Sequence, residues 1–133
     1  MNTIIVLDDE PSNLNIISLL LRLQGHDVLQ ASSGQEAIEV STRHRGPIQL
    51  AVADLQLGIS SGTDVAVDLT KSRPEMAVLF ISGTPLNGWG HRDRDLFDSF
   101  QPNAVDFLEK PFGERALTEK VSHLLQREAA MHV

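Results

Sequence analysis

The sequence contains no cysteine, which excludes a disulfide framework, a thiolate metal site and a cysteine nucleophile. Basic residues are also scarce, because 11 lysines and arginines face 18 aspartates and glutamates, for a net charge of −7. This excess of negative charge argues against binding to nucleic acid or to an anionic membrane surface, since both attract positive charge. No apolar run approaches the roughly 18 residues of a membrane span, and the N-terminus lacks the basic region and cleavage site of a signal peptide.

The remaining composition is that of an ordinary globular protein. Of the 133 residues, 41% are hydrophobic and 22% are charged, and the sequence contains no internal repeat, linker or low-complexity tract. This length and composition predict one self-supporting domain over residues 1–133, in a soluble protein of the cytoplasm.

Short apolar runs alternate along the chain with stretches whose apolar residues recur at helical spacing. The runs predict β-strands at residues 3–7, 27–31, 48–53, 76–81 and 104–108. The spacing predicts helices at residues 12–24, from 33 to about 46, 63–72, around 93–100 and from 113 to about 128, with Ser12 capping the first. Because strands and helices alternate, we expect an α/β fold: a doubly wound, five-stranded parallel sheet covered on both faces.

Polar side chains stand where four of the predicted strands end: Asp8 and Asp9, then Asp54, Ser82 and Lys110. In a doubly wound sheet the carboxyl ends of the strands meet in one crevice, so these groups converge. The carboxylates repel one another unless a cation or a proton intervenes, and oxygen ligands without histidine or cysteine favour Mg²⁺. A magnesium ion, an ammonium and a hydroxyl suit a phosphoryl group. Asp54 stands alone after its strand and is therefore the expected nucleophile, forming an acyl phosphate.

The order and spacing of these residues resemble the receiver domain of bacterial response regulators, and the resemblance covers nearly the whole chain. It rests on Asp8-Asp9, on Asp54 with Gly62 eight positions later, on Ile81-Ser82-Gly83 and on Lys110-Pro111-Phe112. The resemblance implies a (βα)5 flavodoxin-like fold with strand order 2-1-3-4-5. It also implies a phosphorylatable signalling switch rather than an enzyme, which takes a phosphoryl group from a histidine kinase or a histidine phosphotransfer protein and speeds its own dephosphorylation.

The resemblance assigns Mg²⁺ and its ligands residue by residue. Asp54 is the phospho-acceptor, and Asp9 and Asp54 bind Mg²⁺ directly. Asp8 contributes mainly through water, and the backbone carbonyl of Gln56 is a third protein ligand.

A second group of residues is implied to hold the phosphoryl group and to transmit its arrival. Ser82 holds a phosphoryl oxygen once Asp54 is modified, and Lys110 forms an ion pair with it. Phe107 matches the aromatic switch position, which turns inward when Ser82 moves. Gly83 is small and leaves the site open to the phosphodonor and to water.

Two features depart from the family pattern. Gly58 stands where receivers usually have proline, so we expect the loop 58–62 to be flexible. The chain between Ser82 and Lys110 is longer than usual, with the surplus in residues 84–103, which puts any standard partner interface in doubt. We expect residues 84–92 to be mobile before phosphorylation and to change order after it.

Two stretches of this long segment carry residues whose role the resemblance does not assign. Trp89 lies between two glycines, where it either anchors a partner or packs back onto the domain. The charged run 92–95 is typical of a solvated surface.

Three alternatives to a phosphorylatable receiver remain open from the sequence. A Mg²⁺-dependent haloacid-dehalogenase-like phosphatase has similar chemistry, but it needs an Asp-x-Asp nucleophile motif and acidic ligands after the lysine, whereas no aspartate follows Lys110. A phosphate- or flavin-binding module needs a loop of backbone donors after the first strand, where this chain is acidic. A degenerate receiver would serve only for docking.

The chain after Lys110 is long enough for one helix and a short tail, so the sequence predicts a receiver with no output domain, either stand-alone or excised from a larger regulator. We expect a monomer or weak dimer that binds neither nucleic acid nor membrane. The downstream effector is a protein that the sequence does not identify.

Overall fold

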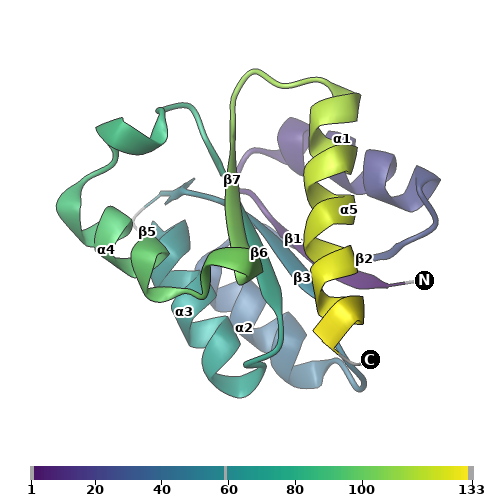
Figure 1. Cartoon of the computed structure of the whole chain (residues 1–133). Helices are drawn as coiled ribbons and strands as arrows, with labels where there is room; N and C mark the ends of the chain where they lie inside the picture. The colour runs from purple at the N-terminus through teal and green to yellow at the C-terminus, as the bar shows by residue number, and fades with distance from the viewer. Residues whose placement is uncertain (1, 59, 132–133) are drawn as a thin grey trace.

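The central layer is a sheet of five parallel strands (Figure 1), in a computed structural model that describes residues 2–58 and 60–131. The strands are β1 (Thr3–Leu7), β2 (Asp27–Ala31), β3 (Leu50–Asp54), β6 (Ala77–Ser82) and β7 (Val105–Glu109). They lie in the order β2-β1-β3-β6-β7 and every neighbouring pair is parallel. The intervening β4 (Gln56–Leu57) and β5 (Ser60–Ser61) form a separate antiparallel hairpin. Counted within the large sheet, the order is therefore the expected 2-1-3-4-5.

Helices cover both faces of the sheet, as Figure 1 shows. They are α1 (Pro11–Leu23), α2 (Gly34–Arg43), α3 (Gly62–Ser72), α4 (His91–Ser99) and α5 (Glu114–Met131). Helices α1 and α5 pack on one face, while α2, α3 and α4 pack on the other. Two short 3₁₀ turns, η1 (Leu86–Gly88) and η2 (Pro102–Ala104), precede and follow α4. This arrangement confirms the predicted doubly wound α/β fold.

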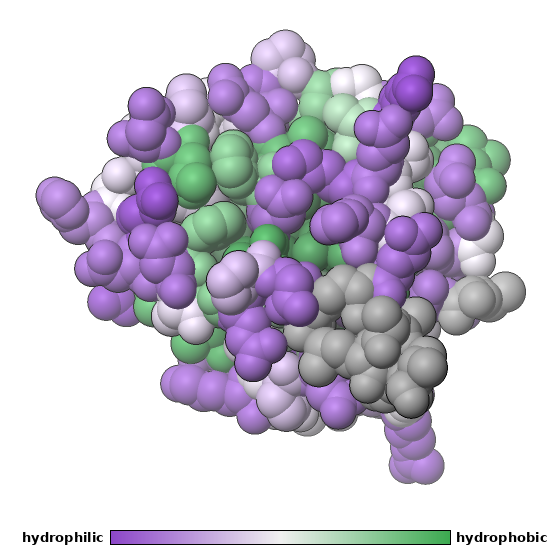
Figure 2. All heavy atoms as spheres, in the orientation of Figure 1, coloured by the Kyte–Doolittle hydropathy of each residue, from purple (hydrophilic) through white to green (hydrophobic). Residues whose placement is uncertain are grey.

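The core has two layers because successive residues of each strand point to opposite faces. Ile4 and Val6 of β1 pack with α1 and α5, whereas Ile5 and Leu7 pack with α2 and α3. Every residue of β3 and β6 is buried, as expected for central strands of a parallel sheet. On the face shown in Figure 2, hydrophilic side chains cover most of the surface and apolar side chains appear between them.

Three predicted strands are displaced toward their carboxyl ends. The predicted strand 76–81 begins at Ala77, because the Met76 amide bonds back to Arg73 in a turn. The predicted strand 104–108 begins at Val105, because Ala104 closes η2, and the predicted strand 48–53 begins at Leu50. At their carboxyl ends these strands continue into polar residues. Asp54 and Ser82 are therefore the last residues of β3 and β6 rather than the first residues after them.

The start of α1 also differs from prediction. Glu10, not Ser12, caps the helix, and its side chain accepts a hydrogen bond from the Ser12 amide at 2.9 Å. Pro11 is then the first helical residue, where its fixed φ is favourable and its missing N–H costs nothing. Helix α2 begins as predicted behind Ser33, whose side chain accepts from the Glu36 amide at 3.1 Å.

The two segments that depart from the family pattern are the loop 58–62 and residues 84–103. Both contain regular structure within the residues that the structure describes. Gln56 and Leu57 pair with Ser61 and Ser60 in the β4–β5 hairpin. Residue 59 lies outside the described residues, so the flexibility of the loop 58–62 stays a prediction. The expected helix around 93–100 is present as α4 and begins slightly earlier, at His91. No helix within residues 2–58 and 60–131 has the length and apolarity needed to cross a membrane.

Candidate functional site

The carboxyl ends of the strands are joined laterally by backbone hydrogen bonds just beyond the ladders. The Leu55 amide donates to the Ile81 carbonyl at 2.8 Å, and the Lys110 amide donates to the Ser82 carbonyl at 2.8 Å. On the other side, the Asp8 amide donates to the Ala31 carbonyl at 3.2 Å. These bonds fix the backbone from which the predicted site residues project.

Asp54 and Lys110 form a close ion pair at this edge. The Lys110 Nζ donates to Asp54 Oδ2 at 2.5 Å, and the Asp54 side chain is only 8% exposed. The other carboxylate oxygen, Oδ1, accepts a hydrogen bond from the Gln56 amide at 2.8 Å. Both oxygens of the expected phospho-acceptor are therefore held in a defined orientation, one of them against an ammonium.

Asp8 is buried beside Asp54 and is incompletely satisfied. Its Oδ1 accepts from the Glu10 amide at 2.9 Å, but its buried Oδ2 has no hydrogen-bond partner among the residues that the structure describes. Burial raises the pKa of Asp8 to about 6, and the negative charge of Asp54 adds to the increase. The site thus contains more negative charge than Lys110 alone compensates.

This excess of buried carboxylate fits a divalent cation with oxygen ligands. Asp9 is exposed and lines a hollow of about 500 Å³ together with Gln56 and Gly58, so an ion there is accessible from solvent. Within residues 2–58 and 60–131, no three histidine or acidic side chains are grouped closely enough to hold a metal by themselves. The predicted set combines two direct carboxylates, Asp9 and Asp54, with a backbone carbonyl and water. The individual ligand roles of Asp8, Asp9, Asp54 and Gln56 stay predictions.

Gly62 has a steric reason to stand eight residues after Asp54. A Cβ atom at Gly62 would collide with the Asp54 carbonyl oxygen and come within 3.0 Å of the Leu55 Cα. The Gly62 amide also donates to the Leu55 carbonyl at 2.7 Å, which brings the start of α3 against the end of β3. The motif therefore specifies the backbone that carries the acceptor.

Ser82 and Gly83 lie where the sequence predicts. Ser82 is 4% exposed at the end of β6, and its Oγ accepts a hydrogen bond from the Thr84 amide at 3.0 Å. Gly83 is exposed, and nothing lies within 4 Å of where its Cβ would be. The role of Gly83 in leaving the site open to the phosphodonor and to water stays a prediction.

Phe107 is half-buried in an aromatic cluster under α4. Its ring lies edge-on to Trp89 and to Phe97, each with centroids 6.2 Å apart. The Lys120 Nζ lies 5.5 Å from the centroid of the Phe107 ring and forms an ion pair with Asp106 at 3.1 Å. The switch role of Phe107 stays a prediction.

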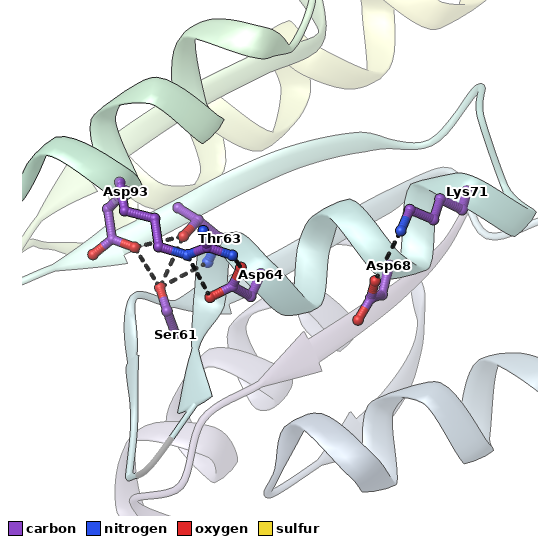
Figure 3. Close-up of polar contacts among 7 residues, drawn as sticks. Ser61, Thr63, Asp64, Asp68, Lys71 and Asp93 are labelled. Atoms are coloured by element: carbon purple, nitrogen blue, oxygen red, sulfur yellow. Dashed lines mark hydrogen bonds and ion pairs between the residues drawn. The ribbon is translucent and has the colours of Figure 1, made fainter.

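The charged run 92–95 was predicted to be a solvated surface, and this is wrong for Asp93. Figure 3 shows Asp93 of α4 directed at Ser61 and Thr63, at the start of α3. Asp93 Oδ1 accepts hydrogen bonds from Ser61 Oγ and Thr63 Oγ1, each at 2.6 Å. Arg92 adds an ion pair with Asp64 at 2.6 Å. Only tertiary proximity reveals these contacts, because nothing in the run itself distinguishes Asp93 from its neighbours.

Known proteins resemble this chain in sequence and in fold. A model of the response regulator receiver domain matches residues 4–122. The chain is 26% identical over 127 residues to the transcriptional regulatory protein GlrR of Escherichia coli (strain K12), covering 95% of this chain and 27% of that protein. It is 28% identical over 125 residues to the probable transcriptional regulatory protein TcrX of Mycobacterium tuberculosis, covering 94% of this chain and 50% of that protein. The chain thus spans about a quarter to a half of the length of these curated relatives.

A solved structure also superimposes on nearly the whole chain. The response regulator receiver domain protein of Clostridium thermocellum is 27% identical, with a TM-score of 0.79, and the match covers 98% of this chain and 99% of that one. Receiver domains are signalling switches of two-component systems, are phosphorylated by histidine kinases and generally bind Mg²⁺. Nothing in these comparisons favours the haloacid-dehalogenase-like phosphatase. The family model and the solved structure show that this chain belongs to the response regulator receiver domain family.

Proposed function

We propose that Asp54 accepts a phosphoryl group from the phosphohistidine of a histidine kinase or a histidine phosphotransfer protein, and that this modification switches the binding of a downstream protein. The observation that carries the proposal is the buried Asp54 carboxylate held at 2.5 Å from Lys110. The buried, unsatisfied Asp8 oxygen beside it supports a Mg²⁺ ion as the partner of the reaction.

In the proposed transfer, a carboxylate oxygen of Asp54 attacks phosphorus while the bond from phosphorus to the imidazole nitrogen breaks. The bonding electrons remain on that nitrogen, which takes a proton from solvent, and Asp54 becomes an acyl phosphate. Lys110 and the Ser82 hydroxyl then interact with phosphoryl oxygens. Bound Mg²⁺ supplies positive charge that offsets the repulsion between the carboxylates and the phosphoryl group.

Loss of the phosphoryl group follows the same geometry. A water molecule attacks phosphorus, the acyl phosphate bond breaks, and the Asp54 carboxylate and inorganic phosphate are regenerated. The absence of a side chain at Gly83, with no atom within 4 Å of where its Cβ would be, supports access by water. We therefore propose that the protein speeds its own dephosphorylation.

Phosphate uptake tests the proposal against a receiver that serves only for docking. Incubation with Mg²⁺ and acetyl phosphate is expected to add one phosphate to the wild-type chain, as measured by intact mass. Asp54→Asn is expected to take up none, and Asp68→Asn, an exposed aspartate of α3 paired with Lys71 (Figure 3), is the matched control that keeps full uptake. Equal uptake by Asp54→Asn contradicts the assignment of the acceptor.

The remaining expectations complete the proposal. We propose a monomer or weak dimer that acts in the cytoplasm and contacts a kinase and an effector protein rather than nucleic acid or membrane. A phosphotransfer profile against purified kinases identifies the cognate partner. Turnover of p-nitrophenyl phosphate at rates typical of a phosphatase would contradict the assignment as a signalling switch.

A further inference from the structure

The long segment after β6 folds back onto the domain through Trp89. The side chain is buried at 9% exposure, and its Nε1 donates a hydrogen bond to the Thr84 carbonyl at 3.0 Å. Gly88 permits this turn to close, because a Cβ atom there would lie 2.7 Å from Thr84 Cγ2. Of the two interpretations left open by the sequence, the structure therefore supports packing on the domain.

Thr84 also forms a hydrogen bond with a residue of the proposed phosphoryl site. Its amide donates to Ser82 Oγ at 3.0 Å, while its carbonyl accepts from Trp89 Nε1. One residue thus connects the hydroxyl that is proposed to hold a phosphoryl oxygen with the indole. When the Ser82 hydroxyl turns toward a phosphoryl group, the Thr84 amide loses its acceptor.

On its other side the indole is in contact with the expected switch aromatic. Trp89 lies edge-on to Phe107 with centroids 6.2 Å apart, to Phe97 at 5.4 Å and to Phe80 at 6.0 Å. The ring of Phe107 cannot turn inward along this side without a change in its contact with the indole. Trp89 consequently contacts Phe107 directly and is connected to Ser82 through Thr84.

We propose that Trp89 is a positioning residue that couples Ser82 to Phe107 and stabilises the unphosphorylated conformation. This proposal rests on phosphorylation of Asp54 as proposed above. When Ser82 turns to the phosphoryl group, Thr84 is released, the indole loses its acceptor, and the contact that holds Phe107 is weakened.

The hydrogen bonds of Asp93 confine this movement to the segment before α4. Asp93 ties the first turn of α4 to Ser61 and Thr63, as Figure 3 shows, and Arg92 adds its ion pair with Asp64. Because α4 is fixed to α3 at this point, a displacement of Thr84 is taken up by η1 and Trp89.

The coupling has a thermodynamic consequence. A hydrogen bond that exists only in the unphosphorylated conformation opposes binding of a phosphoryl mimic, so its removal strengthens that binding. For one neutral hydrogen bond the expected change is about fivefold. Trp89→Phe removes the indole N–H and keeps a smaller aromatic ring in the cluster, so it removes this bond while retaining part of the ring contacts.

The test uses beryllofluoride with Mg²⁺ as the phosphoryl mimic, with its bound fraction followed by ¹⁹F NMR. Trp89 is the sole tryptophan of the sequence, so intrinsic fluorescence reports on it directly. We expect the emission of the wild-type chain to change on saturation, and the emission of Ser82→Ala to stay constant at equal saturation. Trp89→Phe is expected to bind beryllofluoride about fivefold more tightly than the wild type.

Phe100→Leu is the matched control for the aromatic cluster. Among the described ring contacts Phe100 touches Phe80 alone, at 6.0 Å, so its loss lowers stability without a change in beryllofluoride affinity. Constant wild-type emission with beryllofluoride bound overturns the coupling, and so does an undiminished change in Ser82→Ala. These two fluorescence measurements, on the wild type and on Ser82→Ala, decide the proposal even if Trp89→Phe does not fold. Failure of beryllofluoride to bind the wild type overturns the Asp54 site itself, which the ¹⁹F signal distinguishes.

Discussion

Replacement of Asp8 by asparagine is expected to stabilise the metal-free protein. Asp8 is 1% exposed, and its pKa rises from 3.8 to about 6, chiefly through burial. The unfolded chain therefore releases this proton near pH 4, while the folded chain keeps it until about pH 6. As the pH rises through this window, the folded state loses stability relative to the unfolded state.

The size of the effect follows from the pKa change. A rise of about two units, at about 1.4 kcal/mol per unit, gives up to about 3 kcal/mol at pH 7.5. Asparagine is neutral in both states, so Asp8→Asn is expected to gain this amount at pH 7.5. At pH 5 the gain falls to about half, because the folded wild type is already protonated there and part of the cost is removed.

Urea unfolding of both proteins at pH 5 and pH 7.5 without Mg²⁺ measures the gain. Asp9→Asn is the matched control, since Asp9 is exposed and its neutralisation is expected to change stability by less than about 0.5 kcal/mol. Addition of Mg²⁺ is expected to stabilise the wild type and to narrow its difference from Asp8→Asn. A less stable Asp8→Asn, or a gain that does not vary with pH, would refute the reasoning.

Three further substitutions, two of them with matched controls, test contacts that the structure shows. Gly62→Ala is expected to lower the unfolding free energy by about 1–3 kcal/mol or more in urea titration, because its Cβ collides with the backbone of the acceptor; unchanged stability would contradict the close approach. Arg73→Ala removes four hydrogen bonds of 2.8–3.0 Å to the end of α2 and the turn after it, and is expected to cost about 2–3 kcal/mol, whereas the exposed Lys71→Ala costs less than about 0.5 kcal/mol. Asp93→Asn is expected to speed hydrogen exchange in α4, while Asp98→Asn, in an exposed pair, leaves it unchanged; equal exchange in both variants speaks against the link between α4 and α3.

Much of the fold could be predicted because apolar runs specify buried parallel strands. Thr3–Leu7 and Asp27–Ala31 are strands with the predicted bounds. The displaced boundaries have two physical causes: turns before Ala77 and Val105 delay the strand starts, and backbone pairing continues past the last apolar residue, so Asp54 and Ser82 belong to the ladder. Apolar patterning carries no information about such polar strand ends.

The pairing of the site residues was predictable for a different reason. Asp54 and Lys110 are far apart in sequence, but parallel topology brings strand ends together, and the 2.5 Å ion pair lies where this rule places it. The contacts of Trp89 and Asp93 were not predictable, because they depend on how the segment between β6 and β7 folds. Neither hydrophobic spacing nor a charge run specifies that path.

The central claim is that Asp54 is the phosphorylated residue. Treatment of the protein with Mg²⁺ and acetyl phosphate, followed by borohydride, converts an acyl phosphate of aspartate into homoserine and marks its position. Peptide mass spectrometry is expected to find homoserine at position 54 alone, and only when Mg²⁺ is present. Homoserine at Asp8 or Asp9, or the absence of homoserine in protein that has taken up phosphate, would contradict the account.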